Sequence, residues 1–205
     1  MRKLKRELLL ALSKKVTSEC FATLNASITA EAVVIVSACF LGGEMDNIKI
    51  YQVDSCYVDY LVPYAPHLFH NKKIGQQNER KYIGIVLHIN GLDYFAPLSS
   101  FKEKHYRMKE TIDFIKIKNY AVINLNNMFP VESKYYTYVD ISLEYNLKYK
   151  ALLLAEYRVI KSIQDKLRKN AAVIYKLKTS GVQSSMTKRC NDFPKLEELC
   201  LAYKK

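Results

Sequence analysis

Residues 81–109 (KYIGIVLHINGLDYFAPLSSFKEKHYRMK) constrain the fold more than any other stretch. Tyr82–Ile89 is rich in β-branched and aromatic residues, which predicts a buried strand. Asn90 and Gly91 follow at once, and an Asn-Gly pair between two apolar runs is typical of a two-residue hairpin turn because both residues tolerate positive φ. Leu92–Leu98 is the predicted partner strand. The sequence therefore predicts a β-hairpin at the centre of the fold.

The end of the second strand is marked by a proline and then by a cluster of polar residues. Pro97 has no backbone N–H, so we expect the strand to end, or to reach a sheet edge, at this residue. The residues that follow carry hydroxyls and positive charge: Ser99, Ser100, Lys102, Lys104, His105, Arg107 and Lys109. A rigid hairpin that presents such groups at an exposed end is a suitable scaffold for a functional site.

The charge of the chain indicates the kind of partner. The 205 residues are 49% hydrophobic and 25% charged, as in an ordinary globular protein with one sizeable domain, but the net charge is +12. Such a surplus indicates a polyanion, either nucleic acid or an anionic membrane surface. The alternative is a basic protein with scattered lysines. The clustering of cations with hydroxyls and with many of the 16 tyrosines favours the polyanion, because tyrosines can stack on bases.

Cysteine and histidine spacing gives no sign of a metal centre. The five cysteines form no C-x-x-C pair, so neither a zinc site nor a disulfide framework is indicated, and free thiols in the cytoplasm are expected. His67 and His70 have H-x-x-H spacing without a third ligand nearby. In the central stretch Asp93 and Glu103 stand alone, which disfavours a metal-dependent nuclease. We therefore predict no metal and no cofactor.

Residues 1–44 differ from the rest of the chain. They contain an apolar run at 8–12, which is too short for a signal-peptide core, and a second run at 32–41, which is too short to span a bilayer and lies too deep in the chain for an ordinary signal. Three interpretations stay open: a helical appendage, an anchor that lies on a membrane surface, or a segment outside the working protein, with translation starting at Met45. We favour the third, and predict a functional domain over residues 45–205.

The remaining elements suggest an α+β fold. Strands are expected at Ile48–Val53, Phe114–Lys118, Ala121–Leu125 and Tyr135–Ser142, and helices at Ser55–Val62, from Asn146 to about Gly181, and after Asp192. The long helical run has a predicted apolar face with Leu152, Ala155 and Val159, and a candidate kink at Asn170. Short connections between strands favour antiparallel pairing.

Tyr57 and Tyr60 lie three residues apart and so share one face of the predicted helix 55–62. Two interpretations stay open for them. They are either half-buried packing residues or platforms on which RNA bases stack.

A hydroxyl–cation cluster without paired carboxylates suits one kind of RNA chemistry. The 2′-OH of RNA can attack the adjacent phosphate without a metal ion. The protein must then help to remove one proton, supply another to the departing 5′-oxygen, and stabilise charge on the phosphorane. Lysine, arginine and serine side chains can do parts of this work. Many RNA-binding proteins also carry such clusters and cut nothing.

Several motifs occur in one order along the chain. They are Tyr82-Ile83-Gly84-Ile85-Val86-Leu87, then Tyr94 with Ala96-Pro97-Leu98-Ser99-Ser100, Lys102 and His105, then residues 123–128 with Pro130, and finally Phe193 with Leu196-Glu197-Glu198. Together they resemble the RNase toxins of type III toxin–antitoxin systems, the ToxN/AbiQ family. The resemblance covers the chain from about Met45 to the C-terminus.

The resemblance implies a fold and a site. The fold would be a strongly twisted antiparallel sheet, a partial barrel, wrapped by α-helices, with a C-terminal helical segment. Ser100 and Lys102 match the active-site pair of such toxins, with Ser99 in the preceding position. In such toxins a basic residue just before the strand that begins here at Tyr82 also contributes; Arg80 or Lys81 matches it, and Arg80 is preferred. Phe101 stands where the family often has proline.

The resemblance also implies an activity and a partner. The activity would be metal-independent, sequence-specific cleavage of cellular RNA that leaves 2′,3′-cyclic phosphates. The partner would be a small repeat RNA antitoxin, which the toxin processes and then binds in a closed toxin–RNA assembly. The role would be phage defence by abortive infection, or the maintenance of a plasmid or locus.

We expect RNA contacts from the following residues: Tyr57, Tyr60, Lys81, Lys104, His105, Arg107, Lys109, Lys116 and Lys118. A non-catalytic basic RNA-binding protein is the main alternative, and a membrane-surface protein that uses residues 1–41 is a more distant one.

Overall fold

The computed structural model describes residues 47–71 and 80–204. The predictions for residues 1–44 lie outside the described residues and stay predictions. No helix within the described ranges is long and apolar enough to cross a membrane.

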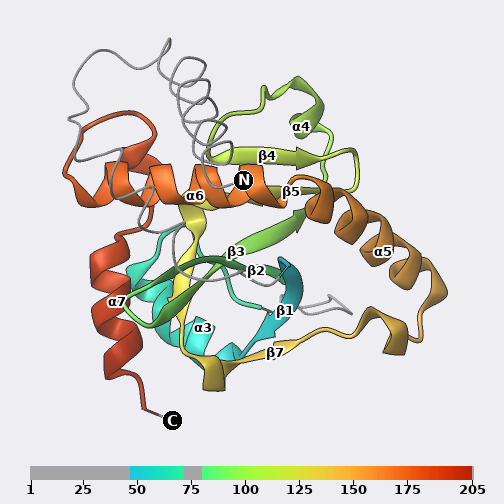
Figure 1. The fold of residues 1–205 in the computed structure, drawn as a ribbon, viewed down its shortest axis with the longest axis horizontal. Helices are drawn as coiled ribbons and strands as arrows, with labels where there is room; N and C mark the ends of the chain where they lie inside the picture. The colour runs from blue at the N-terminus through green and yellow to red at the C-terminus, as the bar shows by residue number, and fades with distance from the viewer. Residues whose placement is uncertain (1–46, 72–79, 205) are drawn as a thin grey trace, which may run out of the picture. The chain divides into compact units, whose positions relative to one another are not determined.

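The described residues form an α+β domain around a seven-stranded sheet (Figure 1). The strands are β1 Lys49–Val53, β2 Tyr82–Ile89, β3 Leu92–Ser100, β4 Phe114–Ile117, β5 Ala121–Asn124, β6 Phe129–Val131 and β7 Tyr136–Tyr138. Every pairing is antiparallel, as predicted. The order is β4-β5-β3-β2-β1-β7, and β6 pairs with β3 beside this path. The sheet is twisted and is not closed into a barrel, because β4 and β7 end the order in the described part of the chain.

The predicted hairpin is confirmed as β2 and β3. Asn90 and Gly91 have φ values of 54° and 77°, the left-handed conformations that a two-residue turn of this kind requires. Gly84 of β2 lies against the ring of Phe95 in β3, and a Cβ at Gly84 would be 2.2 Å from Phe95 Cε1. Only glycine therefore fits at this position without a shift of the phenylalanine ring.

β3 continues past Pro97, so of the two predicted alternatives the strand end is wrong, whereas the local sheet edge agrees with the pairing: Pro97 pairs with Tyr82 of β2 and with no described strand on its other side. The strand continues to Ser100, and Leu98, Ser99 and Ser100 pair with β5. The Leu98 N–H donates to Lys81 O on the β2 side at 3.1 Å. Because N–H groups alternate in direction along a strand, the nitrogen of Pro97 faces the other side, between the residues paired with β6 and those paired with β5. No ladder bond is needed there, so proline is tolerated inside the strand.

The described helices are α3 Ser55–Leu61, α4 Lys104–Arg107, α5 Leu147–Ser162, α6 Gln164–Thr179 and α7 Phe193–Ala202. Short 3₁₀ turns occur at Val62–Tyr64, Leu125–Asn127, Ser133–Tyr135, Ile141–Leu143 and Thr187–Arg189. Asp54 and Asp192 cap α3 and α7 as predicted, since their carboxylates accept hydrogen bonds from backbone N–H groups of the first turn.

The long helical run is broken, but not at the predicted residue. Ile163, with φ −118° and ψ 13°, separates α5 from α6, whereas Asn170 lies within α6 and donates to Ile112 O at 3.0 Å. The buried residues of α5 are Leu153, Glu156 and Ile160. Leu152 is 37% exposed, so the predicted apolar face is wrong for this helix. Because the chain changes direction at Ile163, α5 packs a different face against the rest of the domain than it would if it continued straight into α6.

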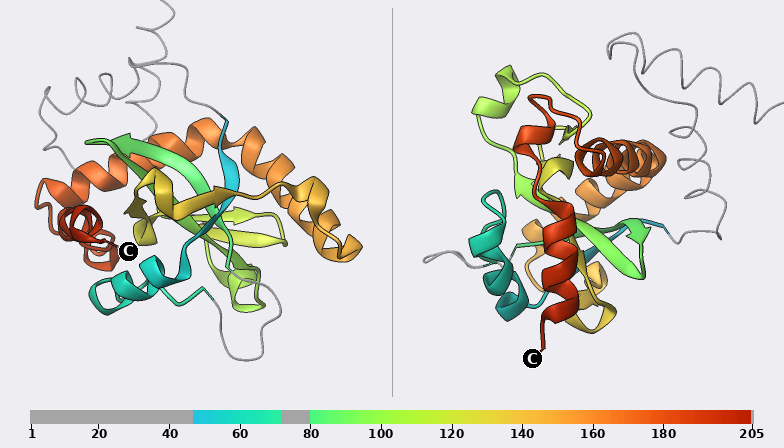
Figure 2. Two further views of the ribbon diagram at one scale, coloured as in Figure 1. Left: turned by 90° about the horizontal axis from the view of Figure 1, so that it is seen from below. Right: turned by 90° about the vertical axis from the view of Figure 1, so that its left-hand side faces the viewer.

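Helices cover both faces of the sheet (Figure 2). On one face α6 packs Leu167, Ala171 and Ile174 against strand residues such as Ile83 and Ile123. On the other face α3 and α7 pack against the rings of strand residues, among them Tyr82, Phe95 and Phe129. The short strand β6 was not predicted. It contains Pro130, and its three residues are buried between β3 and α7.

Tyr57 belongs to this core, and the base-stacking hypothesis is wrong for it. Its side chain is fully buried, and its hydroxyl donates to Pro130 O at 2.7 Å. Burial is the main reason why the pKa of Tyr57 is strongly raised. Tyr60 is half-buried and packs against Tyr203 at a ring-centroid distance of 4.9 Å.

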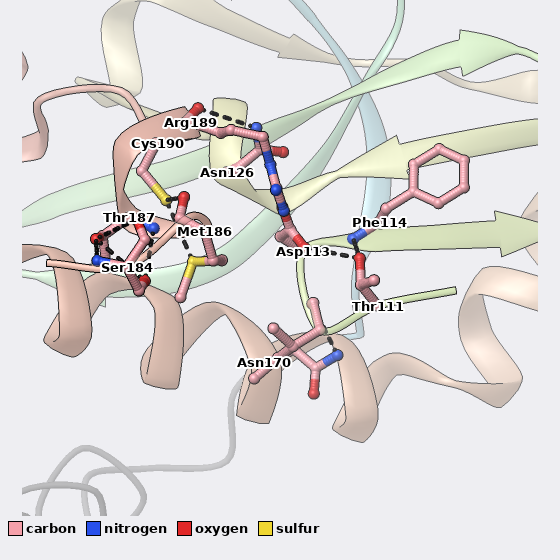
Figure 3. A network of polar contacts seen from close by, with 11 residues as sticks. Thr111, Asp113, Phe114, Asn126, Asn170, Ser184, Met186, Thr187, Arg189 and Cys190 are labelled. Atoms are coloured by element: carbon pink, nitrogen blue, oxygen red, sulfur yellow. Dashed lines mark hydrogen bonds and ion pairs between the residues drawn. The ribbon is translucent and has the colours of Figure 1, made fainter. Parts of the chain in front are cut away.

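Two polar networks connect the helices to the sheet. Buried Asp113, just before β4, accepts a hydrogen bond from Arg189 Nη2 at 2.8 Å and another from the Thr111 hydroxyl at 2.7 Å (Figure 3). In the second network Glu197 of α7 accepts hydrogen bonds from the hydroxyls of Tyr94 in β3 at 2.6 Å and of Tyr175 in α6 at 2.8 Å. We call this second network the Glu197 network.

Candidate active site

The last residues of β3 border a cleft of about 600 Å³. The lining includes polar residues from the start of β2, the end of β3 and the α4 segment: Arg80, Lys81, Ser99, Ser100, Lys102, Lys104 and His105. Residues of α5 and the aromatic ring of Phe69 line it as well. The structure thus brings all four predicted catalytic residues and three of the predicted RNA-contact residues to one cavity.

The two serines of β3 differ in their surroundings. Adjacent residues of a strand point to opposite faces, and the pairing places Ser99 beside Val122 and Ser100 beside Ala121. The Ser99 hydroxyl accepts a hydrogen bond from Arg80 Nη1 at 3.3 Å. Ser100 is exposed, and its hydroxyl makes no hydrogen bond with the residues that the structure describes. Ser100 is therefore the serine whose hydroxyl is available to a ligand.

Arg80 is held in place from several directions. Its backbone N–H donates to Asn71 O at 2.9 Å, and its guanidinium carbon lies 5.6 Å from the ring centroid of Phe69. Its Nε is buried and has no hydrogen-bond partner among residues 47–71 and 80–204. With Nη1 on Ser99, the guanidinium is fixed at the cleft and retains N–H groups for an anion. Lys81 lines the same cleft, so both candidate basic residues reach it.

His105 organises the loop that carries Lys102. Its Nδ1 accepts a hydrogen bond from the Lys102 backbone N–H at 3.0 Å, so in the neutral ring the proton is on Nε2. The ring is 7% exposed and packs against Phe101 and Phe114. Burial lowers the pKa of His105, and the neighbouring lysines lower it further, with Lys104 the first of them. His105 is thus a neutral residue that positions the exposed Lys102 side chain.

Several of the predicted RNA-contact residues lie outside the cleft lining: Tyr57, Tyr60, Arg107, Lys109, Lys116 and Lys118. Arg107, Lys109 and Lys118 are exposed, and Lys116 is half-buried with its Nζ 3.5 Å from Tyr106 O. Except for Tyr57, which is a core residue, these positions stay predictions for contacts beyond the cleft.

The sequence interpretation missed the residues that α5 contributes. Tyr149, Leu152, Leu153 and Glu156 line the cleft, although they lie about fifty residues after β3 in the chain. Glu156 is 5% exposed. One sequence pattern could have predicted Glu156 as a cleft residue. Leu153, Glu156 and Ile160 follow helix spacing, so the carboxylate lies on a helix face that is otherwise apolar.

The cleft combines groups that suit a nucleic acid. The cations can bind phosphate oxygens, the exposed Ser100 hydroxyl can donate a hydrogen bond, and the Tyr149 and Phe69 rings offer surfaces to a base. Among the described residues no group of three or more His, Cys, Asp or Glu side chains is placed to hold a metal ion. His70, from the H-x-x-H pair, instead contacts Asp59 at 2.5 Å.

Comparison with known proteins places this architecture in one family. Residues 49–201 match the family model of the toxin ToxN of type III toxin–antitoxin systems. The chain belongs to the ToxN family. The resemblance inferred from the motifs is therefore confirmed.

Individual relatives agree with this assignment. The chain is 33% identical to the endoribonuclease ToxN of Bacillus thuringiensis subsp. kurstaki over 168 residues, which cover 78% of this chain and 86% of the relative. A solved structure from a study of a processed non-coding RNA that regulates a bacterial antiviral system is 27% identical, with a TM-score of 0.69, and covers 77% of this chain and 99% of that one.

A second solved structure comes from a study of toxin inhibition by a non-coding RNA pseudoknot in type III toxin–antitoxin systems. It is 30% identical, with a TM-score of 0.66, and covers 78% of this chain and 99% of that one. The predicted fold class is thus confirmed by solved members of the family as well as by the strand order.

Proposed function

We propose that this protein is the toxin of a type III toxin–antitoxin system and acts as a metal-independent, sequence-specific endoribonuclease. The observation that carries the proposal is that Ser100, Lys102 and Arg80 line one cleft, with the Ser100 hydroxyl exposed and Arg80 fixed by Ser99 and Phe69. The relative from Bacillus thuringiensis, an endoribonuclease, supports the reaction class.

The chemistry follows from what RNA cleavage requires. The 2′-oxygen attacks the adjacent phosphorus, the bond from phosphorus to the 5′-oxygen breaks, and the products are a 2′,3′-cyclic phosphate and a 5′-hydroxyl. Negative charge builds up on the phosphorane, and the Lys102 ammonium and the Arg80 guanidinium stabilise it. Ser100 donates a hydrogen bond to a non-bridging oxygen. Ser99 acts by orienting Arg80.

The inhibitor in this proposal is a small repeat RNA, which the protein itself processes and then retains. The net charge of +12 supports a polyanionic partner, and a solved relative was studied in connection with inhibition by an RNA pseudoknot. The exposed cations beside the cleft, such as Arg107 and Lys109, extend the basic surface along which the RNA backbone lies. Several toxins and RNAs close into one assembly in the cytoplasm.

The biological role in this proposal is phage defence by abortive infection. A solved relative that comes from a study of a bacterial antiviral system supports it. Release of the toxin from its RNA inhibitor would then expose cellular RNA to cleavage and stop growth of the infected cell.

The test is cleavage of cellular RNA by the purified full chain in excess EDTA, with the new ends mapped and their chemistry determined. Discrete cuts that leave cyclic-phosphate and 5′-hydroxyl ends, and that are absent with Lys102→Ala, are the expected result. Cuts that occur only with added divalent metal would overturn metal independence. Salt-sensitive RNA binding without cuts, unaffected by Ser100→Ala, would instead identify a non-catalytic RNA-binding protein.

A further inference from the structure

Glu156 is the one carboxylate among the described residues that line the cleft. It projects from the middle of α5 and is 5% exposed. Apart from Tyr149, the other titratable groups among the described lining residues are basic side chains: Arg80, Lys81, Lys102, Lys104 and His105. A single buried acid therefore shares a cavity with the residues proposed to bind and cleave RNA.

This position is unfavourable for folding. Leu153 and Ile160 precede and follow Glu156 on the buried face of α5, where a leucine or isoleucine would be expected. Glu156 makes no hydrogen bond or ion pair with any residue of the described ranges. Burial of a carboxylate without a partner is costly. Burial raises the pKa of Glu156 to about 7, so that it changes its protonation state near neutral pH.

We propose that Glu156 is the general base of the cleft and takes the proton from the attacking 2′-OH of RNA. This rests on the proposed endoribonuclease function and completes its proton transfers. The proton moves from the 2′-oxygen to the Glu156 carboxylate, the 2′-oxygen bonds to phosphorus, and the bond to the 5′-oxygen breaks. The Lys102 ammonium gives a proton to the 5′-oxygen. Afterwards Glu156 loses its proton and Lys102 regains one, both by exchange with water.

The other titratable groups at the cleft are unsuited to accept this proton. His105 has Nδ1 occupied by the Lys102 N–H, and its Nε2 carries the proton in the neutral ring. Tyr149 lies on the same helix as Glu156. Burial raises the pKa of Tyr149 to about 12, and the nearby Glu156 and Glu144 charges contribute to the rise, so its hydroxyl stays protonated. Arg80, Lys81, Lys102 and Lys104 supply positive charge. Among the described residues of the cleft lining, only Glu156 combines a free lone pair with a pKa suited to general-base catalysis.

The experiment compares the full-length wild type, Glu156→Gln and the surface control Glu198→Gln. The substrate is a short RNA that contains the cut site mapped with the wild type, and kcat/KM is measured from pH 5.5 to 8.5. Binding is measured with the same RNA carrying a 2′-O-methyl group at the cut site. A third RNA carries sulfur in place of the 5′-bridging oxygen, so that its leaving group needs no proton. Thermal unfolding of each protein is recorded at pH 5.5 and pH 8.

We expect Glu156→Gln to lower kcat/KM by about 10²- to 10⁴-fold and to remove the rise of activity with pH that ends near pH 7. Binding of the 2′-O-methyl RNA is unchanged, the loss persists with the sulfur leaving group, and Tm at pH 8 is higher than in the wild type. Glu198→Gln behaves as the wild type. A gain in stability together with a loss of cleavage separates a catalytic role from a structural one.

The proposal would be overturned if Glu156→Gln cleaved RNA at the wild-type rate, or if its loss of cleavage matched a loss of binding. It would also be overturned if the loss of cleavage disappeared with the sulfur leaving group, because Glu156 would then act as a general acid. If Glu156→Gln does not fold, Glu156→Asp replaces it. Unchanged activity and an unchanged pH profile in that variant would contradict the role of Glu156 as general base. If the wild type itself cuts no RNA, the proposed endoribonuclease function is wrong, and the proposed role of Glu156 is wrong with it.

Discussion

The cleft and the Glu197 network both contain residues from the motifs that link this chain to its family, but the two regions treat their polar groups differently. In the network, Glu197 Oε1 accepts hydrogen bonds from Tyr94 and Tyr175 and so connects α7 to β3 and α6. At the cleft, Ser100 and Lys102 are exposed at the end of the same strand. Tyr94 and Ser100 are six residues apart in β3, yet one is fully buried and the other open to solvent.

This difference separates the polar residues of the family motifs into two groups, those that stabilise the fold and those that are available to a ligand. Polar groups that are buried and paired stabilise the fold, because the loss of one partner leaves the other unsatisfied. Polar groups that are held in position but left unpaired are free to bind a ligand. We therefore expect substitutions in the two regions to separate stability from activity.

The largest expected effect is on activity and comes from the cleft. Lys102→Ala should lower RNA cleavage by about 10³-fold or more, because it removes the cation that stabilises the phosphorane, while Tm stays unchanged since the side chain is exposed. Cleavage is measured with a labelled RNA and stability by thermal unfolding. Ser100→Ala should also abolish toxicity in cells without a loss of fold.

The matched control for Lys102 is Lys169→Ala, which removes an exposed lysine of α6 that does not line the cleft. It should retain most of the cleavage activity. A fully active Lys102→Ala protein would show that cleavage does not depend on this exposed residue of the cleft.

The largest expected effect on stability comes from the hairpin that joins the two regions. Gly84→Ala should lower the free energy of unfolding by about 3 kcal/mol, because the added Cβ would meet the buried Phe95 ring. Gly91→Ala, where φ is +77° and no atom lies within 4 Å of the added Cβ, should cost only about 1 kcal/mol. Urea unfolding measures both, and equal costs would contradict the close-packing explanation.

A smaller loss of stability is expected from the Glu197 network. Glu197→Ala should lower the free energy of unfolding by about 2 kcal/mol, because the buried hydroxyl of Tyr94 loses its partner. The rate of RNA cleavage by the folded protein should not change. Glu198→Ala breaks only the exposed pair with Lys195, which solvent screens, and should leave the free energy of unfolding nearly unchanged. Loss of cleavage by a fully folded Glu197→Ala protein would place a functional role in the network.

The smallest effect is expected from removal of residues 1–44. We expect protein that starts at Met45 to unfold at the same temperature as the full chain and to cut the same RNA sites, because the described residues of the cleft and of the network all belong to residues 45–205. The family model matches residues 49–201, which is consistent with this expectation. A Met45-start protein that does not fold would show that the first 44 residues belong to the working domain.

Local chemistry was enough to predict much of this protein. The Asn90-Gly91 turn, the strand at residues 49–53 and the caps at Asp54 and Asp192 depend on backbone preferences and on neighbouring residues, so they can be inferred from sequence. The motif around Ser100 and Lys102 also indicated the end of β3 as the place of the candidate site, and these residues line one cleft.

Only the tertiary structure decided the rest, because it depends on residues that are distant in the chain. Pro97 lies inside a strand because its nitrogen faces the gap between β6 and β5. Tyr57 is buried because it packs in a core with residues distant in the chain, such as Phe129, and Pro130 O accepts the hydrogen bond of its hydroxyl. Glu156 reaches the cleft because α5 breaks from α6 at Ile163 and packs its Leu153 face toward β1. Pattern and propensity act over a few residues, whereas burial is a property of the whole packed chain.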